Sequence, residues 1–335
     1  MITLETIAVT ESSQIGQARR AAVRLAELAE FPENKRGEVA IIATELATNL
    51  SRYGKDGRFF LQSVQQPDAS YVQMLAVDRG PGIADVPRSM QDGVSTGGTS
   101  GNGLGTVRRM SDVFDIYSSI DQGTTVLARV ARPHRTRRSA ADFQWAVIST
   151  SAPGETVCGD AWRVAEEDGK LTVLVADGLG HGPLAAEAAN RATTLFETTP
   201  HTDLAAFCDR AHVALNGSRG AAVAIAHIAS GRLAYAGVGN IAGTLIGDEK
   251  SRGLSSQNGT VGVTVRRGRA FTYDWPPGGV LVMHSDGLTN RWSLSAYRGL
   301  ASRHPAVIAG VLHRDCLRGR DDATVVVVKK LTGSK

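Results

Sequence analysis

The chain has 335 residues, of which 42% are hydrophobic, 21% are charged and only 5% are aromatic. This composition is typical of a globular protein, and the length suffices for two ordinary domains. The formal net charge of +4 is small, and part of it lies in one stretch, "RPHRTRR" at 132–138. A nucleic-acid-binding protein would cluster Lys and Arg with aromatic residues, so we expect no nucleic acid among the partners.

The cysteines and the N-terminus indicate the compartment. Cys158, Cys208 and Cys316 lie far apart and form neither a metal-binding nor a redox pair, which favours a reducing environment. The first residues lack the basic and apolar regions of a signal peptide, and no run of about 18 apolar residues occurs that would span a membrane. We therefore expect a cytoplasmic protein without membrane contact.

The first part of the chain predicts helices and strands in a mixed order. Apolar residues recur at helical spacing in 14–30 and in 34–54, and the second helix ends at a glycine. A glycine-rich segment precedes a further short helix. The remaining apolar runs alternate as in strands, so that the helix is expected at 103–111 and the strands at 58–66, 70–78, 112–119 and 124–131.

The stretch "ARPHRTRRSAAD" interrupts this patterning and predicts an exposed linker over 132–141. It separates a first domain, 1–131, from a second, 142–331. The second domain is rich in expected strands and has two helices after its first Asp-Gly-Leu, which predicts a β-sandwich flanked by helices and an α+β class for the whole chain. The helices are expected at 183–199 and 203–216, and the strands at 142–150, 171–177, 221–229, 232–240, 242–247, 262–267, 280–286 and 324–330.

Glu45 and Asn49 lie four residues apart, so they share one face of the helix 34–54, beside its apolar stripe. A carboxylate and a carboxamide there can hold Mg²⁺ together with substrate phosphates and can orient a nucleophile. The alternative is an ordinary solvated polar face. The pair alone does not decide between the two.

Two glycine-rich turns follow in the same domain. In "VDRGPGI", Asp78 ends a strand and Gly80 and Gly82 follow; a strand-end carboxylate can accept a hydrogen bond from an exocyclic amine, and glycines let a flat base approach the backbone. "STGGTSGNGLGTVRRM" then brings glycines to a helix N-terminus, which is a ready anion site. The segment has no Gly-Lys-Ser/Thr and opens no βαβ unit, so it is neither a Walker A loop nor a dinucleotide fingerprint.

The order of these pieces, Glu-x-x-x-Asn on a helix, Asp-x-Gly-x-Gly, a glycine-rich turn into a helix and then "GTT", resembles the Bergerat-type (GHKL) ATP-binding domain. "ELATNLSRYGKDG" is most similar to small bacterial serine kinases, the RsbW-like anti-sigma factors and RsbT-like stressosome switch kinases. The resemblance covers about residues 1–131 and implies an α/β sandwich that binds ATP and Mg²⁺. It implies Glu45 as the base for the substrate hydroxyl, Asn49 as a Mg²⁺ ligand, Asp78 as the adenine contact, Gly80 and Gly82 as the shape of that pocket, Gly101, Gly103 and Gly105 as the phosphate lid, and Thr124 as the lining of the adenine side.

In the second domain, carboxylates meet strand ends at four places: Asp160 in "CGDAW", Asp177 in "VADGLGHGP", Asp286 in "SDGLT", and the pair Asp321 and Asp322 in "GRDDAT". Burying such a cluster without cations is costly because the charges repel. Carboxylate and carbonyl oxygens suit Mg²⁺ or Mn²⁺, and two such ions activate water for attack on a phosphoryl group. The alternative for any single Asp-Gly pair is a plain turn.

Four such places in this order resemble the metal-dependent (PPM-class) serine/threonine phosphatases, and most closely the bacterial SpoIIE/RsbX-like branch, over about residues 142–330. Asp322 follows the position of the family's metal ligand, and His181 either shapes the turn or acts as an acid. The chain departs from the branch's "GGDFYD" pattern after Asp160, which leaves a third metal open. The resemblance implies two Mn²⁺ or Mg²⁺ ions, with Asp177 as bridging ligand, Gly178 as carbonyl ligand, Asp286 and Asp321 on the second metal, and Asp160 holding a metal-bound water; Asp177 and Asp286 are the catalytic residues.

Together the two resemblances favour a bifunctional regulator of a bacterial partner-switching or stressosome-type pathway, with a kinase-like domain and a phosphoserine/phosphothreonine phosphatase domain. They imply a STAS-domain antagonist or scaffold protein as substrate, with a sigma factor or a downstream phosphatase as a further candidate partner. The alternative is a phosphatase whose first domain only binds ATP and a partner. Glu45 speaks against it, since a binding module does not need a base. The sequence leaves the oligomeric state open.

Overall fold

The computed structural model describes residues 2–65, 70–91, 103–132, 142–200, 203–247, 250–264 and 267–331. The chain divides into two compact units. Unit 1 comprises Met1–Ser139 and Ser302–Arg314, and unit 2 comprises Ala140–Ala301 and Asp315–Lys335. Of the linker expected at 132–141, only Arg132 lies within the described residues. A segment from late in the sequence therefore belongs to the first unit.

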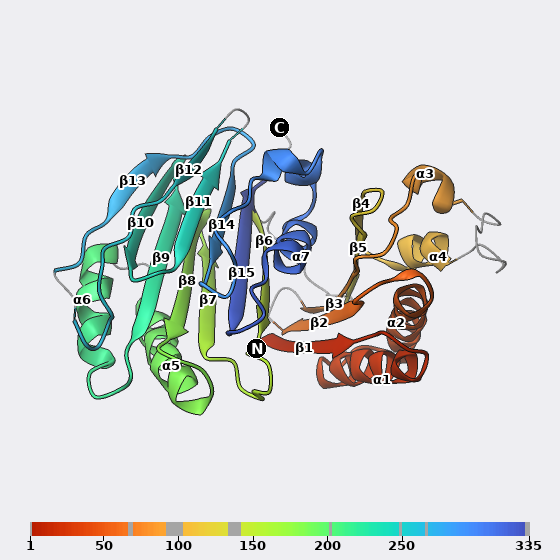
Figure 1. Ribbon diagram of the computed structural model, residues 1–335, viewed down its shortest axis with the longest axis horizontal. Coiled ribbons are helices and arrows are strands. Elements are labelled where there is room, and N and C mark those ends of the chain that lie inside the picture. Colours follow the sequence, from red (N-terminus) through yellow and green to blue (C-terminus); the bar gives the residue numbers. More distant parts are fainter. Residues whose placement is uncertain are drawn as a thin grey trace. The chain divides into compact units, whose positions relative to one another are not determined.

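Unit 1 is built on one antiparallel sheet of five strands in the order β1-β2-β3-β5-β4. Helices α1 and α2 lie side by side on one face of this sheet (Figure 1). Their apolar stripes meet alternate strand residues in a core that includes Leu46, Phe59 and Met74. The elements are β1 (Ile2–Ala8), α1 (Ser13–Leu28), α2 (Glu33–Tyr53), β2 (Arg58–Gln65), β3 (Ser70–Val77), α3 (Val86–Ser89), α4 (Gly103–Met110), β4 (Val113–Ser118), β5 (Thr124–Ala131) and the larger part of α7 (Pro305–Cys316).

Helix α2 carries the first group of expected site residues. Glu33 lies in its first turn and Arg52 in its last, which suits the helix dipole at both ends. Val39, Ile42 and Leu46 are among its buried residues and face the sheet. The helix predicted at 34–54 is confirmed to within one residue at each end.

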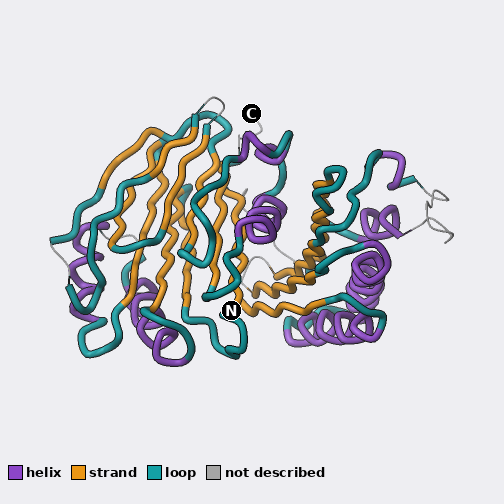
Figure 2. The backbone as a smooth tube through the Cα atoms, viewed as in Figure 1, coloured by secondary structure: helices purple, strands orange, loops and turns teal. Residues whose placement is uncertain are grey.

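Unit 2 contains two antiparallel five-stranded sheets, in the orders β13-β10-β9-β8-β7 and β12-β11-β14-β15-β6. Strands dominate this unit (Figure 2), and helices α5 and α6 cover the first sheet through a core of their own. The elements are β6 (Phe143–Thr150), β7 (Asp160–Glu167), β8 (Lys170–Gly178), α5 (Pro183–Thr198), α6 (Leu204–Ala214), β9 (Ala221–Ala229), β10 (Arg232–Val238), β11 (Ala242–Ile246), β12 (Ser251–Gly253), β13 (Phe271–Asp274), β14 (Val280–His284), the 3₁₀ turns η1 (Leu294–Ala296) and η2 (Leu300–Ser302), and β15 (Ala323–Lys330).

The expected α+β class and the helix-flanked β-sandwich are confirmed, with one strand wrong. The strand predicted at 262–267 does not form over its described residues: 262–263 are a turn, Thr264 makes an isolated bridge with Thr260, and Arg267 lies in a bend. Gly262 has φ +92°, and a β-carbon there would lie 2.7 Å from the carbonyl oxygen of Leu215, so the chain cannot continue extended at this point. The strand that pairs with β10 is instead β13.

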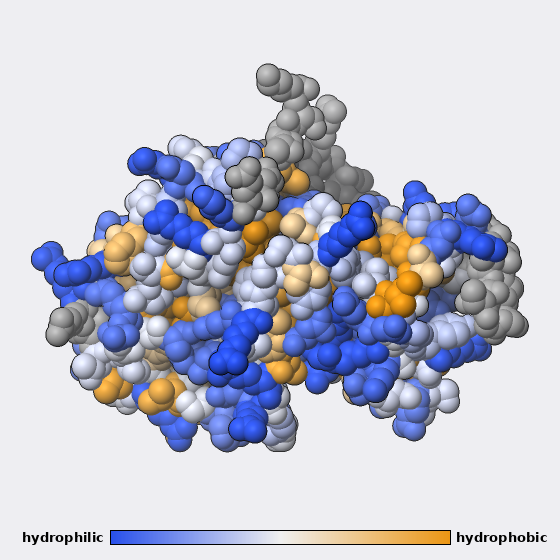
Figure 3. All heavy atoms as spheres, turned by 45° about the horizontal axis from the view of Figure 1, so that its top comes forward, coloured by the Kyte–Doolittle hydropathy of each residue, from blue (hydrophilic) through white to orange (hydrophobic). Residues whose placement is uncertain are grey.

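On the face seen in Figure 3 the surface is mostly hydrophilic, with small apolar areas scattered over it. Its exposed large apolar side chains include Leu28 and Val213, which belong to different helices. Single exposed apolar residues of this kind are ordinary for a folded protein. Among the described residues, no helix combines the length and the apolar character needed to cross a membrane.

Candidate metal centre and nucleotide site

The metal centre expected in unit 2 is built around Asp160 and Asp177. These residues are direct partners in the pairing of β7 with β8. In β8, Leu174 and Ala176 belong to the core beneath α5 and α6. Side chains alternate along a strand, so Asp177 points to the opposite face of the sheet, and its cross-strand partner Asp160 shares that face. Two carboxylates therefore stand next to each other at one end of the sheet.

A hydroxyl group fixes Asp160 from the second sheet. Ser285 Oγ donates a hydrogen bond to Asp160 Oδ2 at 2.7 Å, and the same hydroxyl accepts from the backbone N–H of Thr324 at 3.0 Å. Ser285 immediately precedes Asp286, and Thr324 lies in β15 two residues after Asp322. The strand ends that carry three of the expected carboxylates are thus tied together through one serine.

The other three aspartates have partners of different kinds. Asp286 Oδ2 accepts from the side-chain amide of Asn240 at 2.7 Å. Asp321 Oδ1 accepts from the N–H of Asp322 at 2.9 Å, and Asp322 Oδ1 accepts from the N–H of Ala152 at 2.8 Å. Asp322 is buried, whereas Asp321 is half-buried. Within the pair, Asp322 acts as a buried anchor for a neighbouring loop, and Asp321 keeps access to the surface.

Burial and mutual repulsion disturb the two central carboxylates strongly. Burial raises the pKa of Asp160 to about 7, although hydrogen bonds from Ser285 and Thr324 act in the opposite direction. Burial also raises the pKa of Asp177 to about 9, and the charges of Asp160 and Asp286 add to this effect. A carboxyl group behaves in this way when its negative charge has neither water nor a cation to stabilise it.

The residues fit a divalent cation. Asp160 Oδ1 and Asp322 Oδ2 are buried without a hydrogen-bond partner in the structure, and an unsatisfied buried carboxylate oxygen is costly unless a cation or donor reaches it. Within the described ranges, no three His, Cys, Asp or Glu side chains already stand as a ready ligand set. The hydrogen bonds of Asp286 and Asp321 each engage one carboxylate oxygen, so the other oxygen of each would join Asp177 on a metal.

Gly178 is required by close packing at the end of β8. A β-carbon at this position would lie 1.9 Å from the carbonyl oxygen of Ala185, in the first turn of α5. Its N–H donates to the carbonyl oxygen of Gly159 at 3.2 Å. Only glycine lets the helix start pass this close to the strand end, and Gly159 precedes Asp160, so this packing also positions the first carboxylate.

His181 lies in the exposed loop after Gly178. Its Nδ1 shares a hydrogen bond of 2.6 Å with Glu155 Oε1, and Glu155 belongs to the loop before Asp160. A β-carbon at Gly182 would meet the same carboxylate at 3.0 Å. This hydrogen bond joins the two loops and favours the turn-shaping role of His181, and both roles stay predictions.

In unit 1, Glu45 and Asn49 lie half-buried on α2, one turn apart. Gly103, the first residue of α4, lies directly against them. A β-carbon at Gly103 would lie 2.9 Å from Glu45 Oε2 and 4.0 Å from Asn49 Nδ2. The structure thus brings the expected base and the expected Mg²⁺ ligand next to the N-terminus of α4, although α4 begins more than 50 residues after them in the sequence.

The turn around Asp78 is held by main-chain bonds. Asp78 Oδ1 accepts from the N–H of Gly80 at 2.7 Å, and the N–H of Asp78 donates to the carbonyl oxygen of Thr124 at 2.9 Å. Gly123 has φ +81°, and a β-carbon there would lie 2.0 Å from the carbonyl oxygen of Asp78. Burial raises the pKa of Asp78, while the bonds from the main chain at Gly80 and Thr124 lower it.

The remaining expected residues of the nucleotide site are placed less completely. Gly82 has φ +74° and packs against the carbonyl oxygen of Ser119, in the turn that follows β4. Gly105 is buried within α4. Gly101 lies outside the described residues. The expected phosphate lid is therefore described only from Gly103 onward.

Several residues around the two sites were not expected from the sequence. They are Ser285, Asn240 and Ala152 at the carboxylates, Glu155 at His181, and Gly123 at the Asp78 turn. Ser285 and Gly123 are immediate neighbours of expected residues, so a search of flanking positions would have found them. Asn240 and Ala152 lie far from their partners in the sequence and give no local signal.

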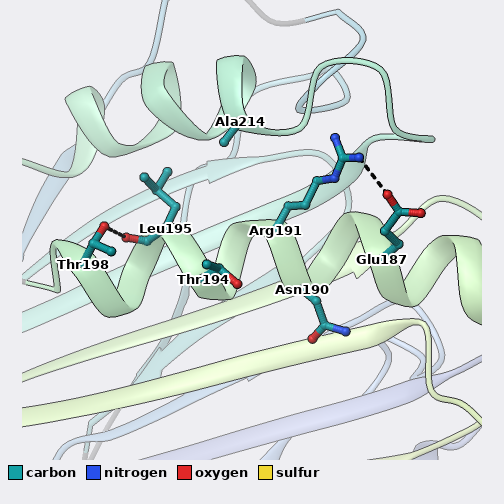
Figure 4. A pocket seen from close by; sticks show the side chains of 7 residues that line it. All are labelled: Glu187, Asn190, Arg191, Thr194, Leu195, Thr198 and Ala214. Atoms are coloured by element: carbon teal, nitrogen blue, oxygen red, sulfur yellow. Dashed lines mark hydrogen bonds and ion pairs between the residues drawn. The ribbon is translucent and has the colours of Figure 1, made fainter.

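A separate hollow of about 620 Å³ lies along α5 beside Ala214 of α6 (Figure 4). Arg191 spans part of it, donating to Glu187 at 2.7 Å and to the carbonyl oxygen of Asn216 at 3.1 Å. None of the clustered aspartates lines this hollow, so it is not the phosphoryl site. Its lining residues are Glu187, Asn190, Arg191, Thr194, Leu195, Thr198 and Ala214.

Comparison with known proteins agrees with both family resemblances. Residues 8–130 match a family described as the histidine kinase-like ATPase domain, and residues 167–330 match the stage II sporulation protein E (SpoIIE) family. The serine/threonine-protein kinase RsbT of Bacillus subtilis (strain 168) is 32% identical over 111 residues, which are 33% of this chain and 84% of RsbT. The first part of the chain belongs to the histidine kinase-like ATPase family, and the second part matches the SpoIIE family. It joins a histidine kinase-like ATPase domain to a SpoIIE-type domain.

The SpoIIE-type domain is similar to the phosphoserine phosphatase RsbX of Bacillus subtilis (strain 168). The identity is 28% over 152 residues, which are 44% of this chain and 75% of RsbX. A crystal structure of RsbX in complex with magnesium matches with a TM-score of 0.51 and 23% identity, over 58% of this chain and 98% of that one. The two family resemblances and the PPM-type sandwich predicted from the motifs are confirmed.

Proposed function

We propose that the SpoIIE-type domain is a metal-dependent phosphatase of phosphoserine and phosphothreonine in proteins. The observation that carries this proposal is the pairing of Asp160 with Asp177 on one sheet face, where burial and repulsion raise both pKa values. Asp177 and the Gly178 carbonyl would hold two divalent ions together with Asp286 and Asp321. Asp160, which accepts a hydrogen bond from Ser285, would hold a metal-bound water. Bound Mn²⁺ or Mg²⁺ supplies charge to stabilise the phosphoryl group and lowers the pKa of water.

Hydrogen bonds and close packing within the chain position the residues that would carry out this reaction. Ser285 donates to Asp160 Oδ2, and the buried Oδ1 without a hydrogen-bond partner would then be the acceptor for the site. Asp322 anchors the loop of Ala152 and leaves Asp321 as the accessible member of its pair. The glycine at 178 brings the start of α5 against the strand end and leaves the main-chain oxygen as the only group that the residue can offer.

The same proposal gives the first domain an ATP-dependent protein serine kinase activity. Asp78 would accept a hydrogen bond from the adenine amine beside Gly80, Gly82 and Thr124. Asn49 would hold Mg²⁺, with Gly101, Gly103 and Gly105 around the phosphates. Glu45 would take the proton of the substrate hydroxyl. The position of Gly103 within reach of both Glu45 and Asn49 supports this arrangement, and the similarity to a protein kinase of the RsbT type supports the activity.

A single substrate would connect the two activities. We infer that it is a STAS-domain antagonist or scaffold protein, as the resemblance to RsbT-like and RsbX-like regulators of partner-switching and stressosome pathways implies. A sigma factor or a downstream phosphatase is a further candidate partner. The chain would then set the phosphorylation level of one protein from both directions, in the cytoplasm.

Two variants of the full chain separate the activities. Each would be incubated with ATP, Mg²⁺ or Mn²⁺ and a panel of STAS-domain proteins, and phosphoserine and phosphothreonine would be followed by mass spectrometry. Asp177→Asn should let phosphoprotein accumulate, because only the phosphatase is lost. Glu45→Ala should only remove phosphate from a protein that is phosphorylated beforehand. If Asp177→Asn binds ATP but phosphorylates no candidate, the first domain is a binding domain and the kinase proposal is wrong.

A further inference from the structure

The segment 302–314 comes from the second half of the sequence but packs as part of unit 1. The ring of His313 in α7 meets Phe60 of β2 edge to face, with centroids 5.3 Å apart. A β-carbon at Gly310 would lie 3.0–3.2 Å from side chains of β3 and β5, namely Thr125, Leu75 and Val77. The helix therefore lies in close contact with strands of the ATP-binding sheet.

A second contact fixes the start of this segment. Asp115 of β4 accepts a hydrogen bond from the N–H of His304 at 2.7 Å and from the guanidinium of Arg303 at 3.2 Å. The His313 ring is buried, and this burial lowers its pKa to about 3, so it packs as a neutral ring. The segment is thus held at both ends by unit 1.

The end of the segment reaches the turn around Asp78. Arg314 Nη1 donates to the carbonyl oxygen of Asp78 at 3.1 Å, and the guanidinium of Arg79 donates to the carbonyl oxygen of Arg314. Arg314 is only 7% exposed. A buried arginine that is hydrogen-bonded to a backbone carbonyl fixes that peptide more firmly than a solvated side chain would. The positive charge of Arg314 also counteracts the burial that raises the pKa of Asp78.

We propose that Arg314 is a positioning residue of the nucleotide site: it holds the Asp78 peptide so that the carboxylate meets the adenine amine. The Asp78 peptide is bonded on its N–H side to Thr124 and on its carbonyl side to Arg314. Gly80 then fixes Oδ1 of the side chain. Without Arg314 the carbonyl oxygen of Asp78 loses this side-chain donor, and the turn keeps only the main-chain bonds of Asp78 to Thr124 and of Arg79 to Lys55 beside that of Gly80 to Oδ1. This inference rests on the proposed role of Asp78 in binding adenine.

The test uses full-length variants and two nucleotides. Inosine triphosphate carries a carbonyl group where ATP carries the amine, so it cannot make the contact that Asp78 offers. Affinities for both nucleotides would be measured by calorimetry for the parent, Arg314→Ala, Arg314→Lys and Asp78→Asn. Arg303→Ala is the matched control, because it removes a guanidinium from the same segment that bonds Asp115 rather than the Asp78 turn.

Arg314→Ala should weaken ATP binding by roughly fivefold or more and leave inosine triphosphate binding nearly unchanged. Arg314→Lys should recover part of the preference for ATP, since an ammonium group can still donate to one carbonyl. Arg303→Ala should keep the parent's preference. Equal loss for both nucleotides, or the same loss in Arg303→Ala, would mean a merely structural role and would overturn the inference.

Asp78→Asn distinguishes failure of this inference from failure of the proposed site. If Asp78→Asn binds ATP as tightly as the parent, the adenine pocket itself is misassigned. If Asp78→Asn loses the preference for ATP while Arg314→Ala retains it, the pocket stands and the role of Arg314 is wrong. If Arg314→Ala does not fold, Arg314→Lys takes its place. A preference for ATP below the parent's in Arg314→Lys, with the parent's preference in Arg303→Ala, supports the proposal. Any other combination of the two counts against it.

Discussion

Replacing Asp177 by asparagine should make the metal-free protein more stable while it abolishes phosphatase activity. The substitution keeps the shape of the side chain and removes one charge from the end of β8. In the folded protein burial and the neighbouring carboxylates raise the pKa of Asp177 to about 9, from an ordinary value of 3.8. The folded state therefore binds this proton more tightly than the unfolded state does. The resulting stability is present in acid and is lost as the pH rises toward 9.

The magnitude follows from this difference. At pH 7 Asp177 is ionised in the unfolded chain. Protonating it on folding costs about 1.36 kcal/mol for each pH unit above its ordinary pKa of 3.8. The upper bound is about 4 kcal/mol. Asp160 shares the same repulsion, so removing one charge relieves both groups, but water and side-chain movement reduce the effect. We expect a gain of roughly 1–3 kcal/mol in unfolding free energy, or about 2–10 °C in the melting temperature.

The assay is thermal unfolding of chelator-treated parent and Asp177→Asn between pH 5 and pH 9, with phosphatase activity measured separately in Mn²⁺. The gain should grow with pH over this range, because the parent loses stability at both Asp160 and Asp177, whereas the variant loses it at Asp160 alone. Asp274→Asn is the control, since Asp274 is exposed and its side chain pairs with the exposed Arg232 at 3.6 Å. A parent and variant with the same melting temperature at pH 8 would refute the repulsion argument, and a fully active variant would refute the metal assignment.

Three further substitutions test the remaining groups. Asp78→Asn should weaken ATP binding by roughly 5- to 150-fold, which corresponds to about 1–3 kcal/mol for a buried hydrogen bond, as measured by calorimetry; unchanged affinity would contradict the adenine assignment. Glu45→Ala should keep ATP affinity and lose phosphate transfer, because only the base is removed; transfer at the parent's rate would rule that role out. Asn240→Ala should raise the Mn²⁺ concentration needed for half-maximal phosphatase activity by roughly 10-fold, since Asp286 loses the donor that orients it; Ser293→Ala, at an exposed turn, is the control, and an equal effect there would count against Asn240.

The local parts of both sites could be predicted from the sequence. Glu45 and Asn49 share a face because any helix brings residues four apart together, and Asp177 faces away from the helix-covered core because side chains alternate in a strand. Their neighbours could not be predicted in this way. β7 was not expected as a strand, so the pairing of Asp160 with Asp177 depends on a register that only the fold defines. Gly103 reaches Glu45 through tertiary packing, and the family resemblance, rather than spacing, pointed to it.

Helix α7 shows why one element escaped prediction altogether. Periodicity reveals a helix when one face is polar, but "PAVIAGVLHRDC" is buried on nearly every side, from His304 through Arg314. Even its two basic side chains near the end, His313 and Arg314, are buried. The contact of Arg314 with Asp78 joins residues 236 positions apart, and no local sequence pattern in either segment predicts it.

The membership of 302–314 in unit 1 leads to a last prediction, about cutting the chain. A fragment of residues 1–139 ends within the expected linker and would lack α7. It would expose the strand residues that the helix contacts, Phe60, Leu75 and Val77, which are all buried in the full chain. Exposed apolar side chains on one sheet face promote association, so the fragment should self-associate in size-exclusion chromatography and melt at a lower temperature than the corresponding transition of the full chain. Adding residues 302–316 through a flexible linker should reverse both changes, whereas the same peptide with Gly310→Leu should not, because Gly310 lies too close to β3 and β5 for a larger side chain. A fragment that is monomeric and equally stable without the helix would show that unit 1 does not need it.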